Sequence, residues 1–178
     1  MIYLFLADGF EECEALVPLD MLRRANIDIS TVGIAKQTIT GAHGISVNCD
    51  LSDTQIDCNG IKGIILPGGM PGALNLENSK AVQNAIDYCD KNSLLIAAIC
   101  AAPQILGHKN LLNGKKAICF PGFEKELKGA EIVNQKSVRD GNIITACGAG
   151  AAFEFAFEII KYLKNDNTAD KLKNNILY

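Results

Sequence analysis

The sequence predicts an α/β fold with a mostly parallel sheet that is covered by helices on both faces. The main observation is that short apolar runs alternate with longer segments of helical spacing, which is typical of βαβ units. The composition agrees, because 48% of the 178 residues are hydrophobic and 21% are charged, as in ordinary globular proteins. A chain of this length and composition predicts one domain, spanning residues 1–178, with a sizeable core.

The expected strands share a short apolar run, and the expected helices share apolar positions three and four residues apart. The strands are Ile2–Ala7, Ile29–Ile34, Gly63–Leu66, Leu94–Ile99, Lys116–Cys119 and Asn142–Ala146, and the helices are Glu12–Ala25, Ser79–Lys91, Ala101–Gly107 and Ala151–Lys164. The segment Thr38–Asp50 alternates polar and apolar residues, so we expect a hairpin that is added to the sheet. The first run is too short to cross a membrane and has no basic region before it, which argues against a signal peptide.

Charge and cysteine content exclude several classes of protein. The net charge is −3 with both signs interspersed, so no basic patch indicates a nucleic acid or membrane partner. The seven cysteines contain no C-x-x-C pair, and with two histidines they do not suggest a zinc site or another metal site. We therefore expect reduced cysteines in a reducing cytoplasm.

Cys100 is the most informative residue because it stands where a buried strand is expected to meet a helix. Helix amides and the positive end of the helix dipole favour a thiolate, which predicts a thiol pKa below the free value of about 8.5. A tight turn there would present the side chain as the nucleophile elbow of strand–turn–helix hydrolases does. The alternative is a small buried hydrophobic residue, the usual fate of a free cysteine.

Glu14 is the second candidate. In a helix its neighbours on the same face are Val17, Pro18 and Met21, so the carboxyl would be partly desolvated. Desolvation raises a carboxyl pKa toward the range that a general acid or base needs. A solvated glutamate in the first turn, favoured by the helix dipole, is an equally good interpretation.

Two glycine-rich segments follow expected strands. Pro67–Gly72 suits a turn whose amides approach a ligand closely, although such a loop alone is weak evidence, and it lacks the P-loop pattern. Gly148–Phe153 departs from the dinucleotide-binding pattern at its last position, so we expect a closely packed helix start and no cofactor. Ligands of such sheets bind at the carboxyl ends of the strands, where Asp8, the Pro67 loop and Cys100 should converge.

His43 and His108 are possible bases for Cys100, but neither has an evident partner in the sequence. The six other cysteines are expected to pack in the core. Cys147 is the exception, because it follows a strand whose end should lie near the site, so a resolving thiol and a structural role both stay open.

Several motifs together resemble one family. The segments Ala7–Glu14, Pro18–Asp20 and Arg23–Ala25, followed by Leu66–Gly69, Ala97–Pro103 and Phe153–Ala156, resemble the ThiJ/PfpI superfamily. The branch is that of the parkinsonism-associated deglycase (DJ-one) and its bacterial relatives. The likeness covers essentially the whole chain.

The resemblance implies a flavodoxin-like three-layer sandwich that forms a homodimer. It implies that Cys100 is an oxidisable nucleophile, that Glu14 is a protonated carboxyl beside the sulfur, and that the amides of Gly69 and Ala101 line an oxyanion pocket. It also implies conversion of methylglyoxal or glyoxal, free or as adducts, to hydroxy acids without cofactor or metal. A redox sensor or chaperone whose cysteine is oxidised to a sulfinate is the alternative.

Two residues depart from related patterns. Protease-like members have histidine directly after the cysteine, whereas this chain has Ala101, so a cysteine hydrolase or amidase ranks third. Many close relatives have histidine before the proline of a later strand-end loop, whereas Phe120 precedes Pro121 here. Glu14 would then manage proton transfer alone or with water.

Overall fold

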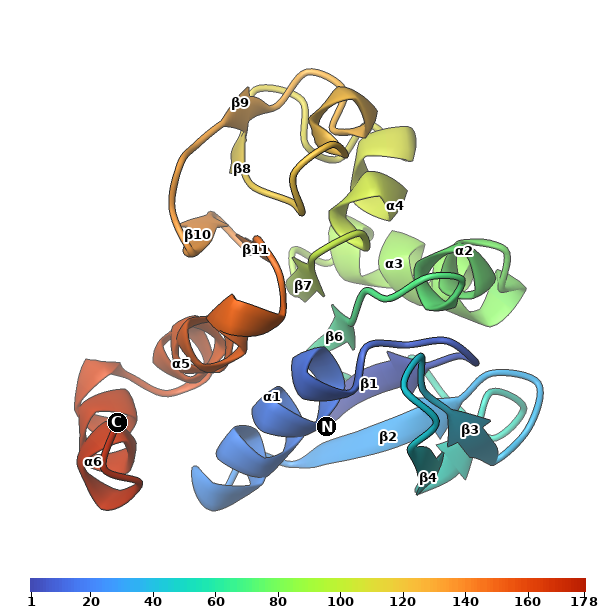
Figure 1. Cartoon of the computed structure of the whole chain (residues 1–178), viewed down its shortest axis with the longest axis horizontal. Helices are drawn as coiled ribbons and strands as arrows, with labels where there is room; N and C mark the ends of the chain where they lie inside the picture. Colours follow the sequence, from blue (N-terminus) through green and yellow to red (C-terminus); the bar gives the residue numbers. More distant parts are fainter.

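The computed structural model describes all residues 1–178, and its centre is a seven-stranded sheet with helices on both sides (Figure 1). The strand order is β10-β11-β7-β6-β1-β2-β5, and every neighbouring pair is parallel except β10 with β11. The strands are β1 (Ile2–Leu6), β2 (Ile29–Gly33), β5 (Leu51–Ser52), β6 (Gly63–Leu66), β7 (Leu95–Ile99), β10 (Ser137–Asp140) and β11 (Ile143–Ala146). The predicted parallel α/β sandwich is therefore confirmed.

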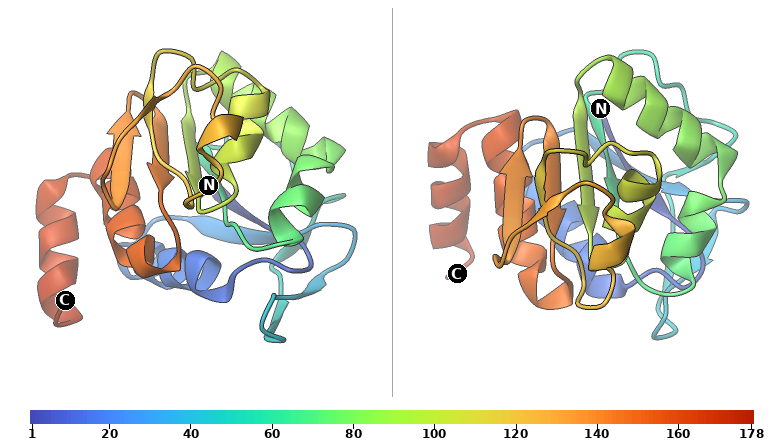
Figure 2. Two further views of the ribbon diagram at one scale, coloured as in Figure 1. Left: turned by 45° about the horizontal axis from the view of Figure 1, so that its top comes forward. Right: turned by 90° about the horizontal axis from the view of Figure 1, so that it is seen from above.

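Two layers of helices enclose this sheet (Figure 1). The first layer contains α1 (Glu12–Arg24), α5 (Ala152–Leu163) and α6 (Asp166–Asn175), and the second contains α2 (Gly72–Glu77), α3 (Lys80–Lys91) and α4 (Pro103–His108). α6 packs on α5 at the outer edge of the molecule, and the β3–β4 hairpin projects at the opposite end (Figure 2). No helix combines the length and apolar character that a membrane crossing requires.

Alternation along the central strands produces two hydrophobic cores. Leu4 and Leu6 point into the core under α1 and α5, whereas Tyr3 and Phe5 point into the core under α3 and α4. Neighbouring strands repeat this division, because successive side chains of a strand leave on opposite faces. A sheet buried on both faces explains why its strands are continuous apolar runs.

The predicted hairpin forms, but it does not join the main sheet. Its strands β3 (Thr38–Thr40) and β4 (Ser46–Asn48) pair only with each other, since the short strand β5 occupies the edge beside β2. The buried Glu12 carboxylate fixes the hairpin to α1 by accepting hydrogen bonds from the His43 amide at 2.8 Å and the Ile45 amide at 3.4 Å.

The prediction of a sheet strand at Lys116–Cys119 is wrong, because the strand is shorter and does not join the main sheet. β8 covers only Lys116–Ala117 and pairs with β9 (Glu131–Ile132) in a separate two-stranded sheet. The antiparallel strand β10 already occupies the edge beside β11. The Ile118 amide instead donates to the buried hydroxyl of Thr145 at 2.9 Å, which holds this segment above β11.

Several elements have no strong signal in the sequence. β10 and α6 are largely polar, α2 directly follows a loop rich in proline and glycine, and β5 has only two residues. The N-cap of α6 is the exception, since the Asn165 side chain accepts a hydrogen bond from the Thr168 amide at 2.9 Å. An Asn directly before a first turn that carries Asp166 was therefore a usable start signal for this helix.

The packing of α4 predicts that alanine at Gly107 destabilises the protein, which is the opposite of the usual effect of alanine in a helix. Alanine normally stabilises a helix by about 1 kcal/mol over glycine. A Cβ at Gly107 would collide with the Glu126 carbonyl oxygen, so we expect Gly107→Ala to lower the free energy of unfolding by about 2 kcal/mol or more. Gly150→Ala is the control, because no atom lies within 4 Å of its Cβ position. Denaturant unfolding in which Gly107→Ala is as stable as the wild type would contradict this packing.

Candidate active site

Cys100 occupies the turn between β7 and α4, at the carboxyl edge of the sheet. Its φ is +64°, a left-handed conformation that is uncommon for a residue other than glycine. Two hydrogen bonds hold this backbone in place: the Cys100 amide donates to the Ala146 carbonyl at 2.9 Å, and the Phe120 amide donates to the Cys100 carbonyl at 2.8 Å. A strained conformation that neighbours enforce in this way is typical of functional positions.

Glu14 lies in the first turn of α1 with its carboxyl turned into the protein, where the residue is only 1% exposed. Its Oε2 accepts a hydrogen bond from the Gly68 amide at 2.9 Å, while its Oε1 is buried without a partner. The side chain of Glu11 caps this turn by accepting from the Glu14 amide at 2.8 Å. The alternative of a solvated glutamate at this position is therefore wrong.

Gly68 is the residue that allows the cysteine and the carboxyl to meet. A Cβ at this position would lie 2.7 Å from Cys100 Cβ and 2.7 Å from Glu14 Oε2. Real Cβ atoms do not approach other atoms so closely, so any side chain here would push the two groups apart. In the glycine loop after β6, the absence of a side chain at Gly68 is thus as important as the backbone amides.

Burial raises the pKa of Glu14 from 4.5 to about 7, and hydrogen bonds from the Cys100 thiol and the Gly68 amide only partly oppose this increase. A carboxyl with such a pKa exchanges its proton near neutral pH, as general acids and bases do. The sequence-based expectation of a desolvated Glu14 carboxyl is consistent with this environment.

The expected low pKa of Cys100 is wrong. Burial, followed by the negative charge of Glu14, raises the pKa of this thiol to about 12, although hydrogen bonds from the Gly69 and Ala101 amides oppose the increase. The sequence pattern at Cys100 suggested the helix amides alone, and only the family resemblance placed a carboxyl beside the sulfur. Because Glu14 carries that charge only when ionised, a protonated Glu14 removes the repulsion and can donate to a thiolate.

The amides of Gly69 and Ala101 have no backbone acceptor. Both hydrogen-bond the Cys100 sulfur, so they converge on the atom where chemistry would occur. Free amide donors directed at a reacting atom are the elements of an oxyanion hole. This arrangement supports the role expected for Gly69 and Ala101, which stays a prediction.

Neither histidine hydrogen-bonds Cys100 or Glu14. His43 Nδ1 bonds Glu12 Oε2 at 2.8 Å on the hairpin, and its side chain is 70% exposed. His108 lies between Glu77 and Glu126, with ring nitrogens 2.5 Å and 2.9 Å from their carboxylate oxygens. These carboxylates raise the pKa values of both histidines, so the two side chains serve as ion-pair partners in the fold.

Glu11, Glu12 and His43 form a group whose possible metal-ligand atoms lie within 4.8 Å of one another. The hydrogen bonds of this group already explain its geometry. Glu11 caps α1, and Glu12 binds the hairpin amides and the His43 ring. These hydrogen bonds connect α1 to the hairpin.

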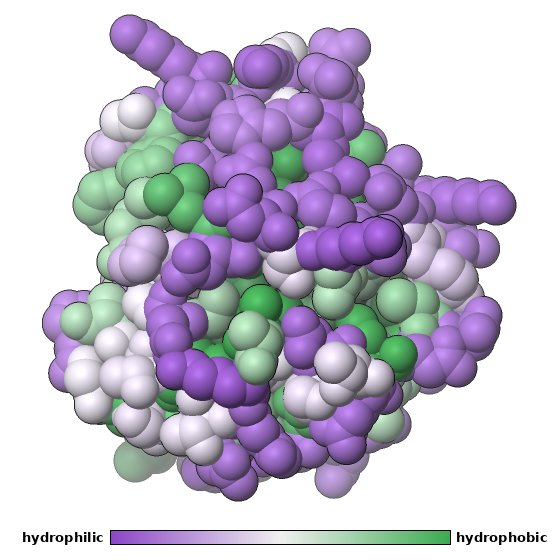
Figure 3. All heavy atoms as spheres, turned by 90° about the vertical axis from the view of Figure 1, so that its right-hand side faces the viewer, coloured by the Kyte–Doolittle hydropathy of each residue, from purple (hydrophilic) through white to green (hydrophobic).

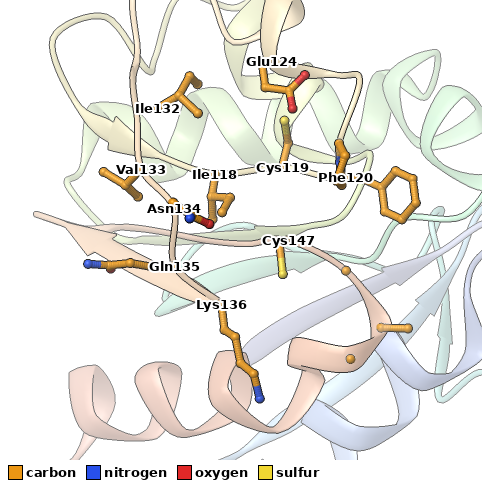
Figure 4. A pocket seen from close by; sticks show the side chains of 14 residues that line it. Ile118, Cys119, Phe120, Glu124, Ile132, Val133, Asn134, Gln135, Lys136 and Cys147 are labelled. Carbon is orange, nitrogen blue, oxygen red and sulfur yellow. The ribbon is translucent and has the colours of Figure 1, made fainter.

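A pocket of about 820 Å³ lies between the β8–β9 region and the start of α5 (Figure 4). Phe120, Lys136, Cys147 and Gly148 are among its lining residues, whereas Cys100 and Glu14 do not line it. A Cβ at Gly148 would lie 3.3 Å from the Phe120 ring and 4.0 Å from the buried Glu14 Oε1, so the wall of the pocket at Gly148 adjoins the carboxyl. Sequence reasoning missed Lys136, whose only signal is its position before a polar strand.

The surface near the site carries exposed apolar side chains. Met70, Leu74 and Phe120 are each between 40% and 48% exposed, in the glycine loop, on α2 and in the loop after β8. The face on the α2 side is largely hydrophilic, and its hydrophobic residues gather in a band across the middle and in a patch at one side (Figure 3). This face is therefore largely polar, while the loops around the site are partly apolar.

Comparison with known proteins agrees with this architecture. Protein DJ-1 homolog A of Arabidopsis thaliana is 34% identical over 97% of this chain, but the chain spans only 45% of that protein's length. A deglycase of Thermococcus kodakarensis is 29% identical over 92% of this chain and 99% of its own. The structure of oxidized Toxoplasma gondii DJ-1 superposes with a TM-score of 0.95 at 30% identity, covering 99% of this chain and 97% of that one.

The model of the DJ-1/PfpI family matches residues 1–162, which include every residue of the site described above. The resemblance inferred from the motifs around Glu14, Gly69 and Cys100 is thus confirmed at the level of the family. This chain belongs to the DJ-1/PfpI family.

Proposed function

We propose that this protein is a cofactor-independent enzyme of the glyoxalase and deglycase type, which converts methylglyoxal or glyoxal, free or as adducts, to hydroxy acids. The observation that carries the proposal is the buried Glu14 carboxyl, with a pKa of about 7, beside a cysteine whose sulfur also meets two free amides. The archaeal relative named a deglycase supports the same class of reaction. The proposed setting is the cytoplasm, and the proposed assembly is a homodimer.

The proposed reaction begins when the Cys100 thiolate attacks the aldehyde carbon of the substrate. A C–S bond forms, the carbonyl oxygen becomes an oxyanion, and the Gly69 and Ala101 amides stabilise it until it takes up a proton. Before the attack, a neutral Glu14 lowers the cost of the thiolate by removing a buried negative charge.

Glu14 then moves a proton within the hemithioacetal. As a carboxylate it removes the hydrogen from the carbon bonded to sulfur, which gives an enediol, and as an acid it returns a proton to the adjacent carbon. This redox-neutral shift leaves a thioester. Water attacks the thioester carbonyl, the C–S bond breaks, and lactate or glycolate leaves while the thiol is restored.

A redox sensor or chaperone is the second candidate, because the same cysteine and carboxyl suit oxidation. Peroxide converts a thiolate to a sulfenic and then a sulfinic acid. A protonated Glu14 would donate to a sulfinate oxygen beside it. A structurally similar Toxoplasma gondii protein is described as oxidized, which makes this chemistry relevant to the family. A hydrolase or amidase ranks third, since no histidine hydrogen-bonds Cys100 as a base.

Cys100→Ala should abolish lactate formation from methylglyoxal in the absence of added thiol. We expect a loss of at least about 100-fold in kcat/KM, since no nucleophile remains to form the hemithioacetal. Cys13→Ala is the matched control, because Cys13 is an exposed cysteine of the helix that carries Glu14. Negligible turnover by folded wild-type protein would remove the enzyme proposal and favour the redox sensor.

Glu14→Gln should keep the fold and lower kcat by roughly 100-fold, because an amide cannot shuttle the proton between the two carbons. Trapping separates this role from attack by sulfur: the variant should accumulate a hemithioacetal on Cys100, seen as the added mass of one methylglyoxal on the intact protein, while lactate formation stays low. Turnover equal to the wild type at every pH would contradict a proton-transfer role for Glu14.

Glu14 also predicts how stability depends on pH. Its pKa is higher in the folded protein, about 7, than the ordinary value of 4.5, so the folded state retains a proton that the unfolded state loses. Its contribution is complete below pH 4.5 and is lost as the pH rises through about 7, with a magnitude on the order of 3 kcal/mol. Chemical denaturation of wild type and Glu14→Gln between pH 4 and 8 measures this contribution, because the other carboxyl groups cancel when the two proteins are compared. Parallel curves for the two proteins would show that folding leaves the pKa of Glu14 unchanged, which would contradict its raised value.

A further inference from the structure

Cys147 directly follows β11, at the position that corresponds to Cys100 directly after β7. The parallel register pairs Ala146 with Ile99, and the Cys100 amide donates to the Ala146 carbonyl at 2.9 Å, so the pairing continues past the end of the strands. Neighbouring strands lie about 4.8 Å apart. The Cα atoms of disulfide-bonded cysteines are usually about 4.4–6.8 Å apart, so this position suits a bond between the two residues.

The surroundings of the two cysteines also match. Both are half-buried, and both pack against the same core cluster, the one that contains Ile99 and Ala146. Gly148, which follows Cys147, has its Cβ position 4.0 Å from Glu14 Oε1, and the other oxygen of this carboxyl accepts from the Gly68 amide beside Cys100. The backbone next to Cys147 and the backbone next to Cys100 therefore both adjoin the same carboxyl group.

Access from solvent differs between Cys147 and the other cysteine nearby. Cys147 and Cys119 both line the pocket of about 820 Å³. Their side chains point in opposite directions in Figure 4, with the sulfur of Cys119 directed toward Glu124. Cys119 is buried. It is a matched control for Cys147, because both cysteines line the pocket but only Cys147 is in register with Cys100.

We propose that Cys147 is a resolving thiol that forms a disulfide with Cys100 after a hydroperoxide has oxidised Cys100. This role goes beyond the proposed glyoxal chemistry and does not require it. In the first step the Cys100 thiolate attacks a peroxide oxygen: an S–O bond forms, the O–O bond breaks, and hydroxide leaves and takes up a proton. The sulfur is oxidised to a sulfenic acid and the peroxide is reduced.

In the second step the Cys147 thiolate attacks the sulfenic sulfur. An S–S bond forms, the S–O bond breaks, and the oxygen leaves as hydroxide, which takes up a proton to become water. The disulfide stops further oxidation, because a sulfur in a disulfide no longer reacts as a thiolate with a second peroxide. A small thiol that enters through the pocket can reduce the bond and restore both cysteines.

Tryptic digestion under non-reducing conditions tests the relay directly. Cleavage after lysine and arginine gives peptide 92–109, whose only cysteine is Cys100, and peptide 140–161, whose only cysteine is Cys147. Wild-type protein treated with an equal amount of hydrogen peroxide should yield these two peptides joined, with a mass two hydrogens below their sum. Reduction should separate them.

The variants Cys147→Ala and Cys119→Ala complete the test. With Cys147→Ala, peptide 92–109 should gain two oxygens in a several-fold larger fraction of the protein, because no thiol intercepts the sulfenic acid. With Cys119→Ala, the joined peptides should form as in the wild type. Equal sulfinate in wild type and Cys147→Ala, or a Cys100 disulfide to another cysteine, would overturn the proposal. Methylglyoxal turnover is measured on the same samples, so failure of the relay is distinguished from failure of the proposed enzyme.

Discussion

The meeting of the Glu14 carboxyl with Gly68 and Cys100 is the contact on which the rest of the site depends. A carboxyl that is 1% exposed has lost nearly all of its hydration, and only one of its two oxygens has a hydrogen-bond partner. Such a group is stable when it holds a proton, which is why its pKa rises to about 7. The neighbouring Gly68 amide and Cys100 are compatible with that proton, and the proposed chemistry uses it.

The cysteine and the glutamate are best understood as one titrating unit. Burial is the main cause of both raised pKa values; the Glu14 charge disfavours the Cys100 thiolate, whereas a hydrogen bond from the Cys100 thiol favours the Glu14 carboxylate. The Gly69 and Ala101 amides favour a negative charge on the sulfur, and a neutral Glu14 removes the opposing charge beside it. A sulfur and a carboxyl coupled in this way suit both the proposed glyoxal chemistry and the proposed peroxide chemistry.

The fold maintains this contact from three directions. α1 brings Glu14 to the carboxyl edge of the sheet, the glycine loop after β6 passes between the two groups, and β11 holds the Cys100 backbone through Ala146. This arrangement is energetically unfavourable at two points, the left-handed backbone of Cys100 and the unpartnered oxygen of Glu14. Extensive burial on both faces of the sheet supplies the stability that such a site needs.

Much of this could be predicted from the sequence, because apolar runs and helical spacing are local properties. The strands β1, β6, β7 and β11 and the helices α1, α3 and α5 follow from them, and the motif around Cys100 indicated the family. Elements without a strong local signal, such as β10 and α6, form because neighbours provide a sheet edge or an apolar surface. The sequence by itself determined which residues are available for chemistry and which strand ends carry them. Only the tertiary structure decided that Glu14 is buried, that burial and the Glu14 charge outweigh the helix amides and raise the pKa of Cys100, and that Cys147 stands in register beside Cys100. Desolvation and proximity arise only when distant segments pack together.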